Sequence, residues 1–84
     1  MGDNARMMTA GQLRAGRALL RWSAMELASH SGVSYAAIAR AEASEGIPGM
    51  QVRNLVSLKA ALEAGGVTFI EADAEGGPGV RLKR

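Results

Sequence analysis

The chain has 84 residues, of which 48% are hydrophobic and 21% charged, and its formal net charge is +2. This length suits one small domain with a thin core, and the absence of cysteine excludes disulfides and thiolate chemistry. Because the chain has one histidine and no cysteine, we expect no metal and no cofactor. No apolar run approaches the roughly 20 residues that span a bilayer, and no signal-peptide pattern is visible, so we expect a cytoplasmic protein without membrane contact.

The first predicted element is a helix that follows a short N-terminal arm. Residues 1–8 show no periodicity, and we interpret them as a flexible arm. Thr9 and Gln12 have the spacing of a capping box, which predicts a helix from that point to about Leu20 or Arg21. The residues expected to face the core from this helix are Leu13, Ala18 and Leu20.

Two further helix starts lie eleven residues apart. Ser23 and Glu26 repeat the capping-box spacing and predict a helix over residues 24–31, which Gly32 ends in the left-handed conformation. Ser34 then caps a third helix over residues 35–43, anchored by Ile38 and Ala41. Two short helices joined by a tight glycine turn form a helix-turn-helix.

A loop and a fourth helix follow. Residues 43–50 are predicted to be a loop by their glycine and proline content. The fourth helix covers about residues 51–64 and ends at the Gly65–Gly66 pair. Its apolar side is expected to consist of Val52, Leu55, Val56, Leu58 and Leu62.

The C-terminal residues have the pattern of strands. Residues 67–70 are β-branched or aromatic, and residues 80–83 alternate between apolar and basic, so the two segments predict a hairpin with a long loop. The fold class is therefore mostly α, with a four-helix domain over residues 9–64 and a β-hairpin over residues 65–84. Since the edges of a two-stranded hairpin invite another strand, we expect a dimerisation element. The expected contacts are Val67, Phe69, Ile70, Val80 and Leu82.

Charge is distributed unevenly along the chain. Residues 1–62 carry seven basic and four acidic side chains, residues 63–80 four acidic and no basic ones, and residues 81–84 three basic ones. The helical body is therefore mildly basic, which is compatible with nucleic-acid binding but far from the dense patch of a non-specific binder.

Residues 23–42 resemble the Cro/repressor-like (XRE) class of helix-turn-helix DNA-binding domains. The matching residues are Leu27, Ala28, Gly32, Val33, Ser34, Ile38 and Glu42. The resemblance covers roughly residues 9–62, and the tail is similar to that of small stand-alone prokaryotic regulators. It implies a sequence-specific transcriptional regulator, a repressor or autoregulator, that acts as a homodimer and places the helix over residues 35–43 in the major groove of double-stranded DNA.

The resemblance also implies which residues contact DNA. Arg40 can pair with guanine or clamp a phosphate, and Tyr35 can bond a base or phosphate. The complete expected set is Ser23, Ala24, Ser34, Tyr35, Ala36, Ala37, Arg40, Gln51 and Arg53. Two positions depart from the family: Ala24 stands where a phosphate-binding glutamine is common, and Glu45 lies in a loop that tends to be basic.

One structural pair follows from the same resemblance. In the family, an arginine of the first helix pairs with the glutamate that ends the recognition helix. The matching residues here are Arg17 and Glu42, and we expect a partly buried ion pair between them.

Alternative functions stay open at this point. The chain contains no catalytic constellation, so no enzyme activity is expected. It can be the antitoxin of a toxin–antitoxin pair, whose tail or acidic loop binds a toxin protein while the helices autoregulate the operon. It can also be a protein-interaction module that has lost DNA binding, which Ala24, Glu45 and the low net charge favour.

Overall fold

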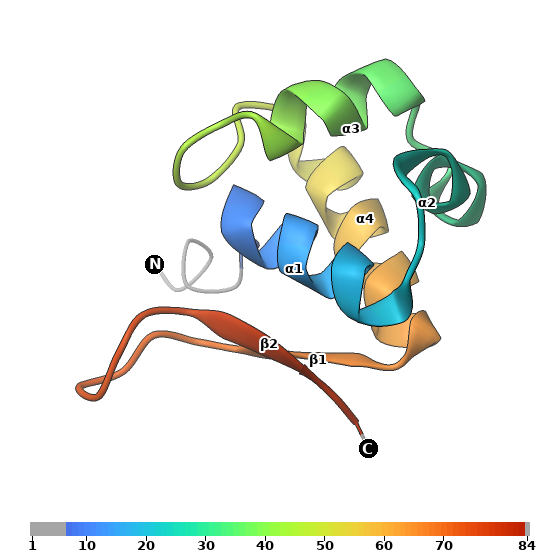
Figure 1. The fold of residues 1–84 in the computed structure, drawn as a ribbon. Coiled ribbons are helices and arrows are strands. Elements are labelled where there is room, and N and C mark those ends of the chain that lie inside the picture. The colour runs from blue at the N-terminus through green and yellow to red at the C-terminus, as the bar shows by residue number, and fades with distance from the viewer. Residues whose placement is uncertain (1–6, 84) are drawn as a thin grey trace.

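The computed structural model describes residues 7–83. Within this range four helices are followed by two antiparallel strands, as the sequence predicts (Figure 1). Helix α3 and the hairpin lie on opposite sides of α1 and α4. The elements are α1 (Ala10–Leu20), α2 (Ala24–Ser31), α3 (Tyr35–Glu42), α4 (Val52–Gly65), β1 (Val67–Ile70) and β2 (Gly79–Leu82).

The helix starts follow the predicted caps. The hydroxyl oxygens of Thr9, Ser23 and Ser34 each accept a hydrogen bond from the backbone amide three residues later, at 3.0–3.1 Å. The first two starts are complete capping boxes. These short-range bonds satisfy amides that have no partner inside the helix, which explains why each helix begins where it does.

The helix ends also lie close to the predicted positions. Gly32 and Gly66 close α2 and α4 with φ of 77° and 116°, as expected of glycine. Helix α1 ends at Leu20, within the predicted range, and its C-cap Arg21 has φ 59° and is the single non-glycine residue with positive φ in the described range. No turn residue marks that position in the sequence.

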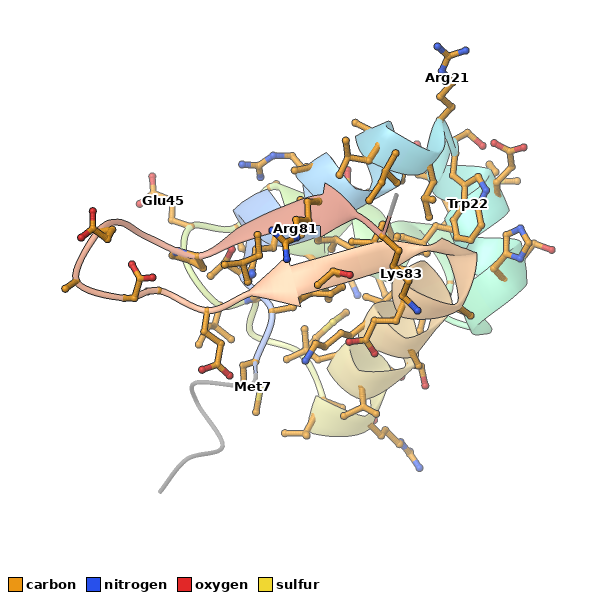
Figure 2. All side chains as sticks on the ribbon, turned by 90° about the horizontal axis from the view of Figure 1, so that it is seen from below. Met7, Arg21, Trp22, Glu45, Arg81 and Lys83 are labelled. Carbon is orange, nitrogen blue, oxygen red and sulfur yellow. The ribbon has the colours of Figure 1, made fainter. Side chains whose placement is uncertain are left out.

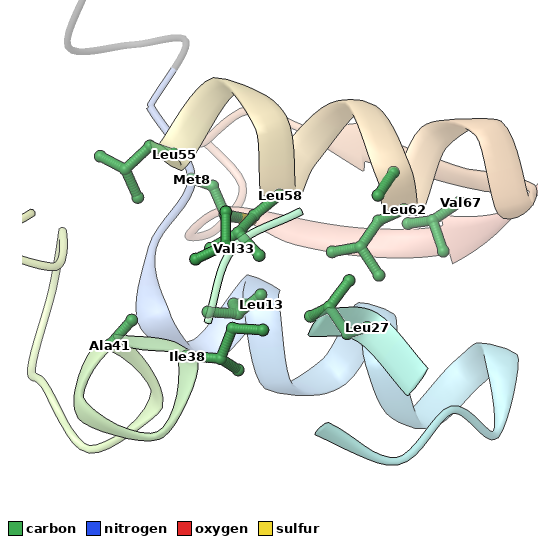
Figure 3. Packing of buried hydrophobic residues seen from close by; sticks show 11 residues of the cluster. Met8, Leu13, Leu27, Val33, Ile38, Ala41, Leu55, Leu58, Leu62 and Val67 are labelled. Atoms are coloured by element: carbon green, nitrogen blue, oxygen red, sulfur yellow. The ribbon is translucent and has the colours of Figure 1, made fainter. Parts of the chain in front are cut away.

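The core lies between the four helices and β1 (Figure 3). The predicted core residues Leu13, Ile38, Leu58 and Leu62 are all fully buried, and so is Leu27. The buried hydrophobic residues that complete the core are Met8, Ala10, Val33, Ala41, Leu55, Ala61 and Val67.

Three predicted core residues are exposed instead, namely Ala18, Val52 and Val56. Helical periodicity gives the direction of an apolar face but not its width, which depends on how many elements pack against it. No element of residues 7–83 covers the side of α4 that carries Val52 and Val56, with exposed fractions of 55% and 60%. In their place, Ala61 faces the core.

The flexible N-terminal arm is predicted to extend to residue 8, but the packed part of the chain begins before that residue. Residues 1–6 lie outside the described residues, whereas Met8 is 1% exposed and belongs to the core, and Met7 packs against it. The side chain of Met8 belongs to the same buried cluster as Leu58 and Val33 (Figure 3). A residue outside any helix carries no periodicity, so its burial has no signal in the sequence.

The two strands pair within the chain. Val67 lies opposite Leu82, and Ile70 opposite Gly79. The loop between the strands is long, as predicted; Asp73 and Gly76 bridge it, and the Asp73 carboxylate accepts from the amides of Glu75 and Gly76. Val67 is completely buried, which contradicts its prediction as a dimer contact; Phe69 and Val80 are partly buried against the same core.

Gly65 permits a close contact that a side chain would prevent. A Cβ atom at this position would lie 2.7 Å from Leu20 Cδ1 and 2.9 Å from Trp22 Cη2. We therefore expect Gly65→Ala to lower the free energy of unfolding by about 1–3 kcal/mol through overpacking, although alanine favours helices. Gly11→Ala is the matched control, because its Cβ would meet atoms only at 3.8 Å or beyond; it should stabilise by about 0.5 kcal/mol. Urea unfolding measures both, and stabilisation by Gly65→Ala would contradict the packing described here.

Candidate nucleic-acid interface

Helix α3 presents a narrow exposed face of small and polar residues. Ile38 and Ala41 are buried, which fixes the rotation of the helix about its axis. Ala36, Ala39 and Arg40 point to solvent, together with Tyr35, whose exposed fraction is 52%. Ala37 lies between the two faces. Because the alanine side chains on this face are short, the helix can approach a large partner closely.

An ion pair ties the end of α3 to α1. Arg17 Nε and Nη2 donate to the two carboxylate oxygens of Glu42 at 2.7 and 2.8 Å, and Arg17 Nη1 donates to the Trp22 carbonyl at 2.9 Å. The two side chains are 25% and 13% exposed. The hydrogen bonds to Glu42 raise the pKa of the Arg17 guanidinium, so Arg17 stays charged throughout the accessible pH range. The structure thus brings together the two residues that the sequence suggests as a pair.

Arg14 makes a second link that sequence reasoning missed. Its Nη1 donates to the Glu42 backbone carbonyl at the C-terminus of α3. A cation at that end also interacts favourably with the helix dipole. In the sequence, Arg14 is one of several arginines at helical spacing, and nothing local distinguishes it from a solvated side chain.

A groove opens between α3 and the beginning of α4. It has a volume of roughly 680 Å³, and its polar lining comes from Arg40, Ser44, Gln51 and Asn54. Of the expected contact residues, Ala37, Arg40 and Gln51 therefore meet at one place although eleven residues separate the last two. Arg53 lies beside it and donates to Gln51 Oε1 at 3.0 Å.

The N-termini of α2, α3 and α4 differ in charge. Helix α2 has Glu26 in its first turn, and this carboxylate accepts from the Ser23 amide at 2.7 Å. Helices α3 and α4 have no acidic residue in their first turns, and no side chain caps α4. Because free amides and a helix dipole attract anions, α3 and α4 are better placed to hold a phosphate than α2 is. Ser23 and Ala24 are consequently the weakest of the expected contacts.

The charges around α3 are mainly positive. Arg40 is exposed and makes no ion pair with any residue in 7–83. Glu42 is paired with Arg17, which leaves the exposed Glu45 in the loop as the nearest opposing charge in the sequence. A free arginine beside a groove with open helix amides is suited to binding a multiply charged anion.

Trp22 lies in the connection between α1 and α2. Its ring stacks on His30 with centroids 4.0 Å apart and an interplanar angle of 8°, and it also lies against Gly65. Trp22 is partly buried, and its contact with His30 was not predicted. Trp22 and His30 are eight positions apart, with the start of α2 between them, and no sequence pattern indicates a contact at that separation.

Residues 7–83 include no helix of the length and apolarity needed to cross a membrane. In the same range, no three acidic, histidine or cysteine side chains gather in a way that would hold a metal ion. Comparison with protein-family models gave no match, and comparison with curated proteins gave none either.

Proposed function

We propose that this protein is a sequence-specific DNA-binding transcriptional regulator that inserts α3 into the major groove. The observation that supports it most is the joint position of exposed, unpaired Arg40 and the uncapped start of α4 at one groove. The resemblance of residues 23–42 to XRE-class domains supports the same interpretation.

In this proposal each of the expected contact residues has a separate role. Arg40 reads a guanine edge or holds a phosphate, and Tyr35 bonds a base or phosphate near the N-terminus of the helix. Ala36 and Ala37 allow close approach and can touch a thymine methyl group. Gln51 and Arg53 bond a phosphate at the start of α4. The Arg17–Glu42 pair touches no DNA and holds α3 in the required orientation.

The proposed mechanism is steric repression or autoregulation by a homodimer. Two copies related by a two-fold axis would bind half-sites about one helical turn, ~34 Å, apart. Fluorescence anisotropy tests the proposal with a short duplex from the region upstream of the gene and a scrambled duplex, at low and moderate salt. Tighter binding to the upstream duplex supports it. Binding to neither duplex at low salt would contradict it and favour a protein-interaction module.

Arg40→Ala is expected to weaken binding to the preferred site by about 1–3 kcal/mol and to relax its sequence preference. Arg40→Lys keeps the charge but loses the bidentate geometry, so it should lose the preference while retaining more of the affinity. Arg21→Asn is the control and should change little, because it removes the same charge from an exposed residue outside the expected contact set and asparagine tolerates the left-handed conformation at this position. A uniform loss over all duplexes with Arg40→Ala would make this residue a phosphate contact.

A further inference from the structure

The outer edge of β2 has backbone groups with no strand to pair with. Lys83 donates from its amide to the Gly66 carbonyl at 2.8 Å. Since hydrogen-bonded pairs alternate along an antiparallel ladder, the next such pairs are Thr68–Arg81 and Ile70–Gly79. The amides and carbonyls of Val80 and Leu82 therefore point away from β1, and the sheet in the described residues has no third strand.

The two edges of the hairpin have different surroundings. Beside β1 lie the charged α4 side chains Lys59, whose Nζ is 5.4 Å from the Phe69 ring centroid, and Glu63. Beside β2 lies α1, joined to it by the hydrogen bond from Gln12 to the Gly79 carbonyl. Leu19 is two turns from Gln12 on the same face of α1. Leu19 and Leu82 are both 40% exposed, so the β2 edge has an apolar border.

The hairpin carries opposite charges at its two ends. Its tip contains three acidic residues within residues 71–75 and no basic one. Arg81 and Lys83 lie at the other end, on the face turned away from the helices (Figure 2). An antiparallel copy of the same hairpin would place its basic end near the acidic tip of the first. This self-complementarity identifies a second copy of the chain as the occupant of the edge.

We propose that two copies join through their β2 edges into a four-stranded antiparallel sheet, with Val80 opposite the partner's Val80. In this register, Arg81 faces the partner's Gly79 and Lys83 the partner's Gly77. If the partner's strand were shifted by two residues in one direction, Arg81 would face the partner's Arg81. If it were shifted by two more residues, Arg81 would face the partner's Lys83. Like charges directly opposite one another destabilise a sheet, so shifts in this direction are unfavourable. A shift in the other direction would set Val80 against the partner's Pro78, which has no amide to donate, and would lose the pair of hydrogen bonds between the two Val80 residues.

This arrangement has a consequence for α3. A two-fold axis through such a pair runs perpendicular to the sheet, so the helices of both copies lie on the same face of it. Both α3 helices then lie on the same side of the dimer, away from the sheet (Figure 1). The inference does not depend on DNA binding, and its test uses the protein alone.

Sedimentation equilibrium of the full chain at concentrations up to about 100 µM tests the proposal, because mass action favours any dimer at the upper end. We expect a dimer whose dissociation constant rises about tenfold or more with Leu19→Arg, since the two-fold axis introduces two charges. Val56→Arg makes the same change at an exposed position of α4 and should leave the dimer intact. A monomeric wild-type chain, or a monomer with Val56→Arg but not with Leu19→Arg, would overturn the proposal. Circular dichroism checks that both variants are folded.

Cysteine cross-linking tests the register, because the chain has no cysteine of its own. A Cβ at Gly79 meets nothing within 4 Å, so Gly79→Cys is tolerated. Mixing Gly79→Cys with Arg81→Cys should give a disulfide-linked dimer on mild oxidation, because the two positions form a close non-hydrogen-bonded pair across the interface. Arg81→Cys alone should give none. A cross-link with Arg81→Cys alone, or none in the mixture, would overturn the Val80-centred register.

Discussion

Glu42→Ala is expected to lower the free energy of unfolding by about 2–4 kcal/mol, which is a large part of the roughly 4–13 kcal/mol expected for a chain of this length. The substitution removes the two carboxylate acceptors of the Arg17 guanidinium, at 2.7 and 2.8 Å, leaves only the Trp22 carbonyl, and leaves a charge that is three-quarters buried without a counter-ion. Because an arginine guanidinium stays protonated at every accessible pH, deprotonation cannot relieve this unpaired charge. Chemical denaturation at neutral pH measures the effect.

A second acidic residue provides the control. Glu63 and Lys59 form a longer pair one helical turn apart, with 3.9 Å between Nζ and the carboxylate, and the Glu63 side chain is 47% exposed. Glu63→Ala should therefore change stability by no more than about 0.5 kcal/mol. In a double-mutant cycle, Arg17→Ala and Glu42→Ala should show a coupling well above the ~0.2–1 kcal/mol typical of exposed pairs. Additive losses in the cycle would contradict a cooperative pair.

The second large effect is expected from Gln12→Glu. Gln12 is 7% exposed and joins α1 to the hairpin: its Nε2 donates to the Ile70 and Gly79 carbonyls at 3.3 and 3.0 Å, while its Oε1 accepts from the Thr9 amide at 2.9 Å. A carboxylate keeps the capping box but turns an acceptor toward two carbonyl oxygens. We expect a loss of about 2–4 kcal/mol at pH 7.

The pH dependence of this variant has a definite sign. Burial and the two carbonyl oxygens should raise the folded-state pKa of the introduced carboxyl above its unfolded value of about 4.3. The penalty is then fully present above the folded pKa and shrinks as the pH falls through it, because a protonated carboxyl can donate one hydrogen bond. The stability difference from the wild type should therefore be smaller at pH 4 than at pH 7.

The only other glutamine of the chain gives the matched control. Gln51 precedes α4, is exposed and does not cap the helix. Gln51→Glu should be neutral or stabilise by up to about 0.5 kcal/mol, because a negative charge is favourable at a helix N-terminus. If Gln51→Glu were as harmful as Gln12→Glu, or if the loss with Gln12→Glu were independent of pH, the proposed role of Gln12 would be wrong.

The sequence by itself determined the elements. Two helices start at Ser23 and Ser34, and two end at Gly32 and Gly66. These boundaries depend on hydrogen bonds and backbone angles within three or four residues, so they can be recognised in the sequence pattern. The exposed face of α3 could be predicted for the same reason, because Ile38 and Ala41 fix it by helical spacing. The Arg17–Glu42 pair was suggested by resemblance to a known family, since nothing local links residues 25 positions apart.

The tertiary structure alone decided how wide each buried face is and which distant groups meet. Val52 and Val56 are as apolar as Leu55 and Leu58, yet they stay exposed because the neighbours of α4 within residues 7–83 cover only one side of it. Met8 and Val67 are buried because the chain before α1 and the strand after α4 close opposite ends of the core. The amide of Gln12 joins carbonyls 58 and 67 residues away. These features depend on packing between elements, and the free energy of such contacts is decided by the three-dimensional neighbours of a residue rather than by its position in the sequence.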